Sequence, residues 1–296
     1  FDRLTNQAMK NRLIAAVAPL VFVLLWSTGF IGAKYALPFV EPYTLLFVRF
    51  VISLAVLLVL FAYFKPVLPA NWPQRLHLML SGLLVHGAYL GGVFSAIKLG
   101  MPAGVCALLV GLQPLLTAIA TPFVFKRRLP LLHWIGIVAG FVGIAMVLSN
   151  QLTADGFGAN AVIAATVALL GITVGAIYQK KITAHTNVLS IAFFQYLSAT
   201  MLFAAGSLIF ESGHVIWDMQ LIVALLWLVF GLSIGAILLL IYLIRKNEAH
   251  KVSSLFYLVP PLTALEAYFL FNETLGILNL TGMVIVAISV FIVMKK

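Results

Sequence analysis

A single arginine, Arg49, lies in an otherwise uncharged run, Leu46–Leu60, whose sequence is LFVRFVISLAVLLVL. A charged side chain inside apolar material is costly and usually faces a protein interior or a wet cavity, where it can pair or bind a ligand. Glu266 is a second charge in an apolar run, and we hypothesise that both residues point inward, where they could face each other. The alternative for Arg49 is that its long stem lets the guanidinium reach the headgroups of a surrounding bilayer.

Three uncharged polar residues also interrupt apolar runs. His86 and Tyr89 lie nearly one helical turn apart on one face, and Gln113 is expected at a similar depth. Histidine titrates near neutral pH, so His86 could carry a proton or hydrogen-bond a substrate, or it could simply bond a neighbouring helix. Certain aromatic residues could provide stacking surface for an amino-acid side chain, or could be ordinary packing, because aromatics make up 12% of the chain. They are Trp26, Phe30, Tyr89 and Tyr257.

Prolines interrupt two of the apolar runs, at Pro114 and at Pro260 and Pro261. A proline inside a helix frees a backbone carbonyl in the preceding turn. At membrane depth such a group is tolerated only where protein or water satisfies it. These two helices are therefore our candidates for a cavity wall and a hinge.

The composition indicates which elements must position these residues. Of the 296 residues, 63% are hydrophobic and 9% are charged, whereas a soluble domain has about 25% charged residues. A helix needs about 20 apolar residues to cross a bilayer, so we predict an all-α polytopic membrane protein. The first apolar run is too long for a signal-peptide core, and we expect it to be a span. Ten transmembrane helices are expected, near 13–37, 43–63, 76–98, 103–125, 131–149, 158–180, 188–211, 217–244, 252–271 and 277–294.

Basic residues gather at the two termini and in the even-numbered loops, whereas most acids fall in the odd-numbered loops. This positive-inside pattern predicts cytoplasmic N- and C-termini. The net charge of +10 therefore orients the chain in a bilayer, and we expect no nucleic-acid partner. Lys34 and Lys98 are exceptions on the outer side. They could be harmless at the interface, inherited from an inverted copy, or they could attract a substrate carboxylate.

The chain aligns weakly but persistently with itself. An offset of 146 residues pairs Arg49 with Gln195, and an offset of 147 pairs Lys126 with Glu273. We therefore predict two copies of a five-helix unit, residues 1–150 and 151–296. Because five is odd, the second copy must enter the membrane inverted, an architecture that recurs in secondary transporters and favours alternating access. Glu273 is expected in the first turn of the tenth helix, where an acid offsets the helix dipole.

Two motifs resemble a known family. WSTGFIGAKYALPFVEPYTLLFVRF (26–50) resembles the opening motif of EamA-type members of the drug/metabolite transporter superfamily, and LFYLVPPLTALEAYFLFNETLGILNLTGMVIVAISVFI (255–292) resembles the closing one. The resemblance extends to YddG-type bacterial exporters. It implies ten helices in two inverted halves, location in the bacterial inner membrane, and export of amino acids, including aromatic ones. The first half departs from the pattern, because Lys126 stands where the second half has Glu273.

Several chemistries lack their signatures. Cys106 is the only cysteine, so no intramolecular disulfide or thiolate metal cluster can form. The sequence has no phosphate-binding loop, no His-Glu-x-x-His pair and no Gly-x-Ser-x-Gly elbow. We therefore expect no cofactor, no metal and no enzyme activity, although a membrane enzyme stays a weaker alternative. The sequence is also compatible with a passive pore and with an exporter of different metabolites or drugs.

The expected partners are a small-molecule substrate and the lipid bilayer. Gly-x-x-x-Gly spacings let helix backbones approach closely. Gly136 and Gly140 lie on what we expect to be an outer helix, where they could support a dimer. We therefore expect a monomer or a weak homodimer.

Overall fold

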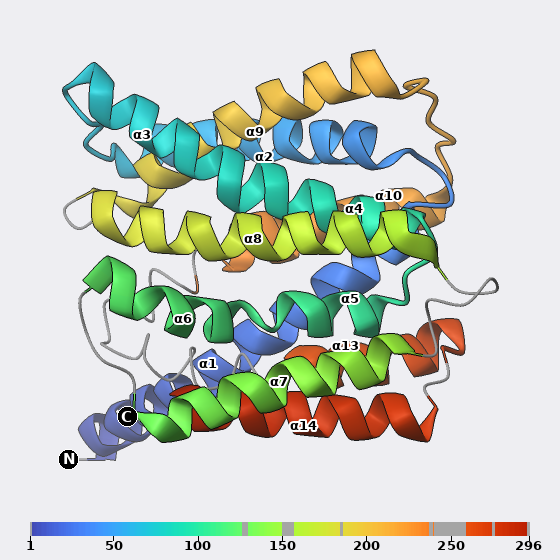
Figure 1. Cartoon of the computed structure of the whole chain (residues 1–296). Helices are drawn as coiled ribbons and strands as arrows, with labels where there is room; N and C mark the ends of the chain where they lie inside the picture. Colours follow the sequence, from blue (N-terminus) through green and yellow to red (C-terminus); the bar gives the residue numbers. More distant parts are fainter. Residues whose placement is uncertain are drawn as a thin grey trace.

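The fold is a bundle of helices that run side by side along one direction (Figure 1). The computed structural model describes residues 2–125, 130–149, 157–183, 186–236, 239, 259–273 and 276–294. In these residues the β pairing consists of one isolated bridge, Val40 with Val215. The predicted all-α class is therefore confirmed for the part of the chain that is described.

Each half contributes its helices in the predicted order. The first half has α1 (Asp2–Ala36), α2 (Pro42–Phe64), α3 (Trp72–Gly82), η1 (Leu83–Ala88), α4 (Tyr89–Lys98), α5 (Ala103–Val110), α6 (Gln113–Phe125) and α7 (Leu131–Ser149). The second half has α8 (Gly158–Ile182), α9 (Val188–Phe210), α10 (Met219–Leu226), η2 (Trp227–Ala236), α13 (Val259–Phe271) and α14 (Ile277–Met294). The segments labelled η are π-helices.

Six helices are long and apolar enough to cross a membrane, which makes this a multi-pass membrane protein. They are Pro42–Phe64, Trp72–Lys98, Ala103–Ala120, Gly158–Ile182, Val188–Phe210 and Met219–Ala236. The shorter apolar helices are Leu20–Ala36, Leu131–Val147, Val259–Phe271 and Ile277–Ile292. All of these lie at predicted segments, while the number of ten crossings and the orientation of the termini stay predictions.

Polar residues at the ends of the apolar runs start several helices. Asn71, Asn187 and Asp218 each accept a hydrogen bond from a backbone N–H of the following turn, at 3.1, 2.9 and 2.8 Å. Such N-caps satisfy donors that the first helical turn leaves without a partner. Pro42 lies in the first turn of α2, where its missing N–H costs nothing.

Two π-helical segments interrupt equivalent crossings, one in each half. η1 joins α3 to α4, and η2 follows α10. An offset of 147 residues carries 83–88 onto 230–235, inside η2. Such π segments are rare and are frequent at functional sites. Nothing in the apolar sequence indicates them.

Glycines allow the closest helix contacts. A Cβ added at Gly92 of α4 would clash with the Ala164 carbonyl oxygen and would lie 2.8 Å from the Ala168 nitrogen of α8. A Cβ at Gly140 of α7 would clash with Leu115 and would lie 3.4 Å from the Cβ of Ser289 on α14. Gly140 therefore packs against α6 and α14 inside the chain rather than on an open face, while the oligomeric state, a monomer or a weak homodimer, stays a prediction.

We predict that Gly92→Ala lowers the free energy of unfolding by about 1–3 kcal/mol, because α4 and α8 must separate to admit the methyl group. Thermal unfolding of the protein in detergent measures this. Gly276→Ala is the matched control, because no atom lies within 4 Å of a Cβ there. Equal unfolding midpoints for the two variants would contradict the close approach of α4 and α8.

Candidate functional site

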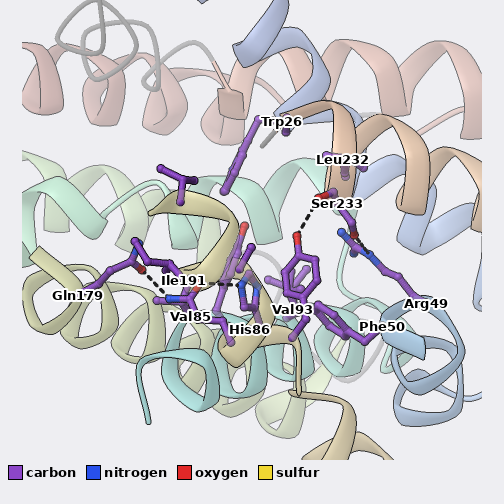
Figure 2. Close-up of a pocket in the computed structure, with 18 of the residues that line it drawn as sticks. Trp26, Arg49, Phe50, Val85, His86, Val93, Gln179, Ile191, Leu232 and Ser233 are labelled. Atoms are coloured by element: carbon purple, nitrogen blue, oxygen red, sulfur yellow. Dashed lines mark hydrogen bonds between the residues drawn. The ribbon is translucent and has the colours of Figure 1, made fainter. Parts of the chain in front are cut away.

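A cavity of about 450 Å³ lies between the two halves. Residues of α1, α2, η1, α4, α8, α9 and η2 line it, so both copies of the repeat contribute to its wall (Figure 2). Five residues that the sequence singled out lie in this wall: Trp26, Phe30, Arg49, His86 and Tyr89. The cavity extends to the C-terminal end of α8, where Gln179, Thr183 and Thr186 line it.

Arg49 is buried in the cavity wall, with 6% of its surface exposed. Its Nε donates a hydrogen bond to Oγ of Ser233 at 3.1 Å, and its guanidinium carbon lies 5.7 Å from the centroid of the Phe50 ring. The Ser233 hydroxyl can accept this bond because its own proton is donated to the Leu228 carbonyl, 3.1 Å away. This burial is incompatible with a guanidinium that reaches the headgroups.

Arg49 and Glu266 do not form an ion pair, although the positions of both are described. Instead, Ser27 donates a hydrogen bond to Oε1 of Glu266 at 2.8 Å, within a contact between α1 and α13. The other carboxylate oxygen of Glu266 is buried without a hydrogen-bond partner among the described residues. The hypothesis that these two charges face each other was therefore wrong, and Glu266 does not line the main cavity.

His86 bonds a neighbouring helix and also faces the cavity. Its Nε2 lies 3.3 Å from Oε1 of Gln195 on α9. The Gln195 amide nitrogen donates to Oγ of Ser81 at 2.9 Å and to Oε1 of Gln179 at 3.1 Å. Through one side chain, Gln195 of α9 therefore links α3, η1 and α8.

These polar contacts obey the pseudo-symmetry of the repeat. Arg49 corresponds to Gln195 at an offset of 146 residues, and His86 corresponds to Ser233 at 147. The hydrogen bond from Arg49 to Ser233 is thus the counterpart of the contact between Gln195 and His86. Each joins the second helix of one half to the π segment of the other half. The two halves therefore contact each other at the cavity through two equivalent pairs of residues.

A smaller cavity of about 220 Å³ adjoins the first and shares Trp26, Phe30 and Tyr89 with it. Gln113 and Pro114 line this second space. The helix break lies at 111–112, between α5 and α6 and just before Gln113. The position of a Cβ at Gly111 would be 3.0 Å from Cγ of Pro260. Pro261 is exposed on α13, and Tyr257 lies outside the described residues.

Several contacts join the two halves at one end of the bundle, which we call the closed end, defined by Lys34, Val40, Glu41, Glu211 and Glu273. Lys34 forms an ion pair with Glu273, and Glu273 also accepts the backbone N–H of Ala103 at 3.2 Å. We had expected Glu273 to offset the dipole at the N-terminus of α14, but α14 begins only at Ile277. Glu273 instead offsets the dipole at the N-terminus of α5.

Two further glutamates tie the closed end together. Glu211 accepts the backbone N–H groups of Tyr43 and Thr44, each at 2.7 Å. Glu41 accepts the hydroxyl and the backbone N–H of Ser212 at 2.7 and 2.8 Å. The Ser212 hydroxyl, with its backbone N–H, lowers the pKa of the Glu41 carboxyl below its usual value. Both glutamates thus join the start of α2 to the end of α9.

Lys98 donates to the Leu37 carbonyl at 2.7 Å, and neither Lys98 nor Lys34 lines either cavity. Both lysines bind protein groups at the closed end. Among the cavity residues that the sequence did not single out are Ser233 and Tyr196, and the Tyr196 hydroxyl donates to the Ser233 carbonyl at 2.8 Å. The repeat offset from His86 is the signal that could have found Ser233.

Two stretches of the chain, residues 13–149 and 159–295, each match the EamA-like transporter family. A "Probable amino-acid metabolite efflux pump" of Salmonella typhimurium is 28% identical, over 92% of each chain. A protein of the same description from Escherichia coli is 27% identical over 93% of each chain. The "Uncharacterized transporter YvbV" of Bacillus subtilis is 26% identical over 98% of this chain and 94% of its own.

A solved structure described as "Crystal structure of protein" has a TM-score of 0.64 at 23% identity, over 94% of this chain and 95% of that one. At this identity the likeness shows the fold alone. The match of both halves to one family confirms the resemblance found in the two motifs.

We predict that Gln195→Leu lowers the free energy of unfolding by about 1–3 kcal/mol, because Ser81, Gln179 and His86 each lose a buried hydrogen-bond partner. Thermal unfolding in detergent measures the change. Thr166→Val is the control, since the Thr166 hydroxyl is exposed and bonds only the Val162 carbonyl of its own helix. The network would be energetically unimportant if both variants unfolded at the parental temperature.

Proposed function

Since the chain belongs to the EamA-like transporter family, we propose that it is a secondary transporter that exports amino acids, including aromatic ones, by alternating access between its two halves. Two relatives described as probable amino-acid metabolite efflux pumps support export of a small metabolite. We place the protein in the bacterial inner membrane, with both termini in the cytoplasm. Family membership also indicates a transporter rather than an enzyme.

The observation that carries the proposal is the cavity between the halves, which reaches Thr183 and Thr186 at one end of the bundle and includes none of the residues that define the closed end. Its volume of about 450 Å³ is in the range that holds small ligands. Trp26, Phe30 and Tyr89 give it an aromatic wall, which suits an apolar or aromatic side chain. A passive pore would connect both ends at once, so a cavity that does not reach the residues of the closed end favours a carrier.

The reciprocal contacts supply a physical basis for alternation. Because Arg49–Ser233 and Gln195–His86 are equivalent pairs, tilting one half against the other can open either end at similar cost. The closed end carries the odd-numbered loops, which the charge pattern predicts to be outside. We therefore assign the structure to a state that is closed to the outside.

The two ends differ in charge, which biases the alternation. The closed end holds the Lys34–Glu273 ion pair. The equivalent positions in the other copy are Lys180 and Lys126, two cations, at offsets of 146 and 147 residues. Like charges cannot form the equivalent pair, so this interaction stabilises only the state that is closed to the outside.

Counterflow in proteoliposomes tests the function. Vesicles containing the purified protein are loaded with unlabelled amino acids, and uptake of a labelled amino acid is followed, with protein-free vesicles as the control. We expect saturable exchange restricted to certain amino acids. Flux that does not saturate would favour a pore, and no exchange of any amino acid by folded protein would count against amino-acid export.

We predict that Lys34→Glu and Glu273→Lys each weaken the closed end, because each places like charges together. The pair is partly exposed, at 30% and 11%, so the expected cost is about 1 kcal/mol, roughly a fivefold shift between states. Leu232 lines the main cavity. In a Cys106→Ala background, labelling of the Leu232→Cys variant from outside by an impermeant maleimide measures the opening.

The double variant, Lys34→Glu with Glu273→Lys, is the matched control. It restores opposite charges and should return the labelling rate towards that of the parent. Equal labelling in the single and double variants would show that the ion pair does not hold this end shut.

A further inference from the structure

We propose that Arg49 is the carboxylate-binding group of the main cavity, and that the cavity selects net-anionic carboxylates, such as N-acylated amino acids, over zwitterions and cations. This narrows the export function proposed above and rests on it, because zwitterionic amino acids are then carried as weaker substrates than their net-anionic, N-acylated forms. The ligand class follows from the charges that line the cavity and from the hydrogen bonds that the Arg49 guanidinium leaves open.

The Arg49 guanidinium has donors to spare. A guanidinium carries five N–H donors, and in the described residues Nε alone has a hydrogen-bond partner, Oγ of Ser233. Figure 2 shows the side chain of Arg49 reaching Ser233 in the wall of the cavity. The N–H groups of the two terminal nitrogens stay available for the parallel hydrogen bonds that a carboxylate accepts from arginine.

Among the residues that the structure describes, Arg49 also has no counter-ion in this cavity. The acidic side chains whose placement is described all lie elsewhere, and none lines the wall. They are Glu41, Glu211 and Glu273 at the closed end, Asp218 at the start of α10, and Glu266 beside Ser27. The Phe50 ring, 5.7 Å from the guanidinium carbon, offsets a buried cation only weakly. An anion that enters the cavity therefore supplies the missing opposite charge.

The same charge distribution disfavours a substrate ammonium. In a free amino acid the ammonium lies within a few bonds of the carboxylate, so it would be held close to Arg49 with no described acid to pair with. Gln195 offers a neutral oxygen, but this oxygen already contacts His86. Acylating the amine removes its charge and leaves the carboxylate, which is why the net anion fits best.

The rest of the wall suits the apolar part of such an anion. Trp26, Phe30 and Tyr89 line the same cavity as Arg49. Aromatic side chains bind apolar groups and rings favourably. The expected ligand therefore joins one carboxylate to an apolar or aromatic body.

Three compounds test the selectivity on the parent protein at pH 6: N-acetylphenylalanine, phenylalanine and phenylalaninamide, which carry net charges of about −1, 0 and +1 at that pH. Each competes with labelled N-acetylphenylalanine for counterflow into proteoliposomes. We expect the inhibitory concentration to rise in that order, with the amide at least about tenfold weaker than the N-acetyl acid. An amide or a zwitterion that competes as well as the N-acetyl acid would overturn the proposal.

Variants of Arg49 assign the selectivity to its charge. Arg49→Gln, which copies the residue of the repeat partner Gln195, should abolish the discrimination between acid and amide, whereas Arg49→Lys should keep its direction. Arg75→Gln is the matched control, because it removes the same charge from a residue outside the cavity whose Nε donates to the Pro69 carbonyl. Full discrimination in Arg49→Gln would refute the role of Arg49.

A binding measurement separates this proposal from the export function. Thermal stabilisation of the detergent-solubilised parent by each compound reports binding without transport. Stabilisation by the N-acetyl acid and not by the amide, without exchange in vesicles, would support the subsite and count against export. Exchange of amino acids with no preference for the anion would support export and overturn the anion-selective subsite. If Arg49→Gln does not fold, the competition and stabilisation series on the parent still decide the selectivity.

Discussion

The contact between α2 and α9 is the interaction on which the rest of the site depends. Phe50 of α2 and Tyr196 of α9, which correspond to each other in the repeat, meet with their ring centroids 5.0 Å apart. The preceding residue on each helix, Arg49 or Gln195, reaches the π segment of the other half. A contact between equivalent residues must lie close to the pseudo-twofold axis that relates the two halves. The cavity therefore lies around this axis.

The π segments make these cross-contacts possible. A π-helix widens the turn, so that groups five residues apart approach each other. The Ser233 hydroxyl uses this spacing to reach the Leu228 carbonyl, and it can then accept the bond from Arg49. Tyr196 satisfies the Ser233 carbonyl. The irregular backbone is thus paired by side chains that line the cavity, which is where a membrane protein tolerates it.

The sequence predicted the helical class, the positions of the apolar segments and the family, because these follow from hydrophobicity and from motifs along the chain. It also placed Trp26, Phe30, His86 and Tyr89 in apolar runs, and all of them line the cavity. It did not predict which side of each helix faces inward, since a helix that is apolar all round shows no periodicity. The supposed partnership of Arg49 with Glu266 failed for this reason.

Other features depend on contacts between distant parts of the chain. The Lys34–Glu273 pair joins residues that lie far apart in sequence. The sequence around either residue does not predict that the other is its partner. From the sequence, Glu273 was assigned to the dipole of the helix that follows it. Its actual partner, the N-terminus of α5, is brought near it only when the chain folds. Even so, the repeat held more information than we used, since the offset that links Arg49 to Gln195 continues to His86 and Ser233.

The two halves share a backbone plan but differ in charge, and this difference limits what the proposed alternation can do. Arg49 corresponds to Gln195 in the repeat, and Glu273 corresponds to Lys126. Such asymmetry changes the relative populations of the two states and the affinity of the cavity for an anion. It cannot by itself set the direction of net transport, because both states bind the same substrate and a closed cycle obeys the substrate gradient. The proposed export therefore requires a higher substrate concentration inside, or a second, coupled species.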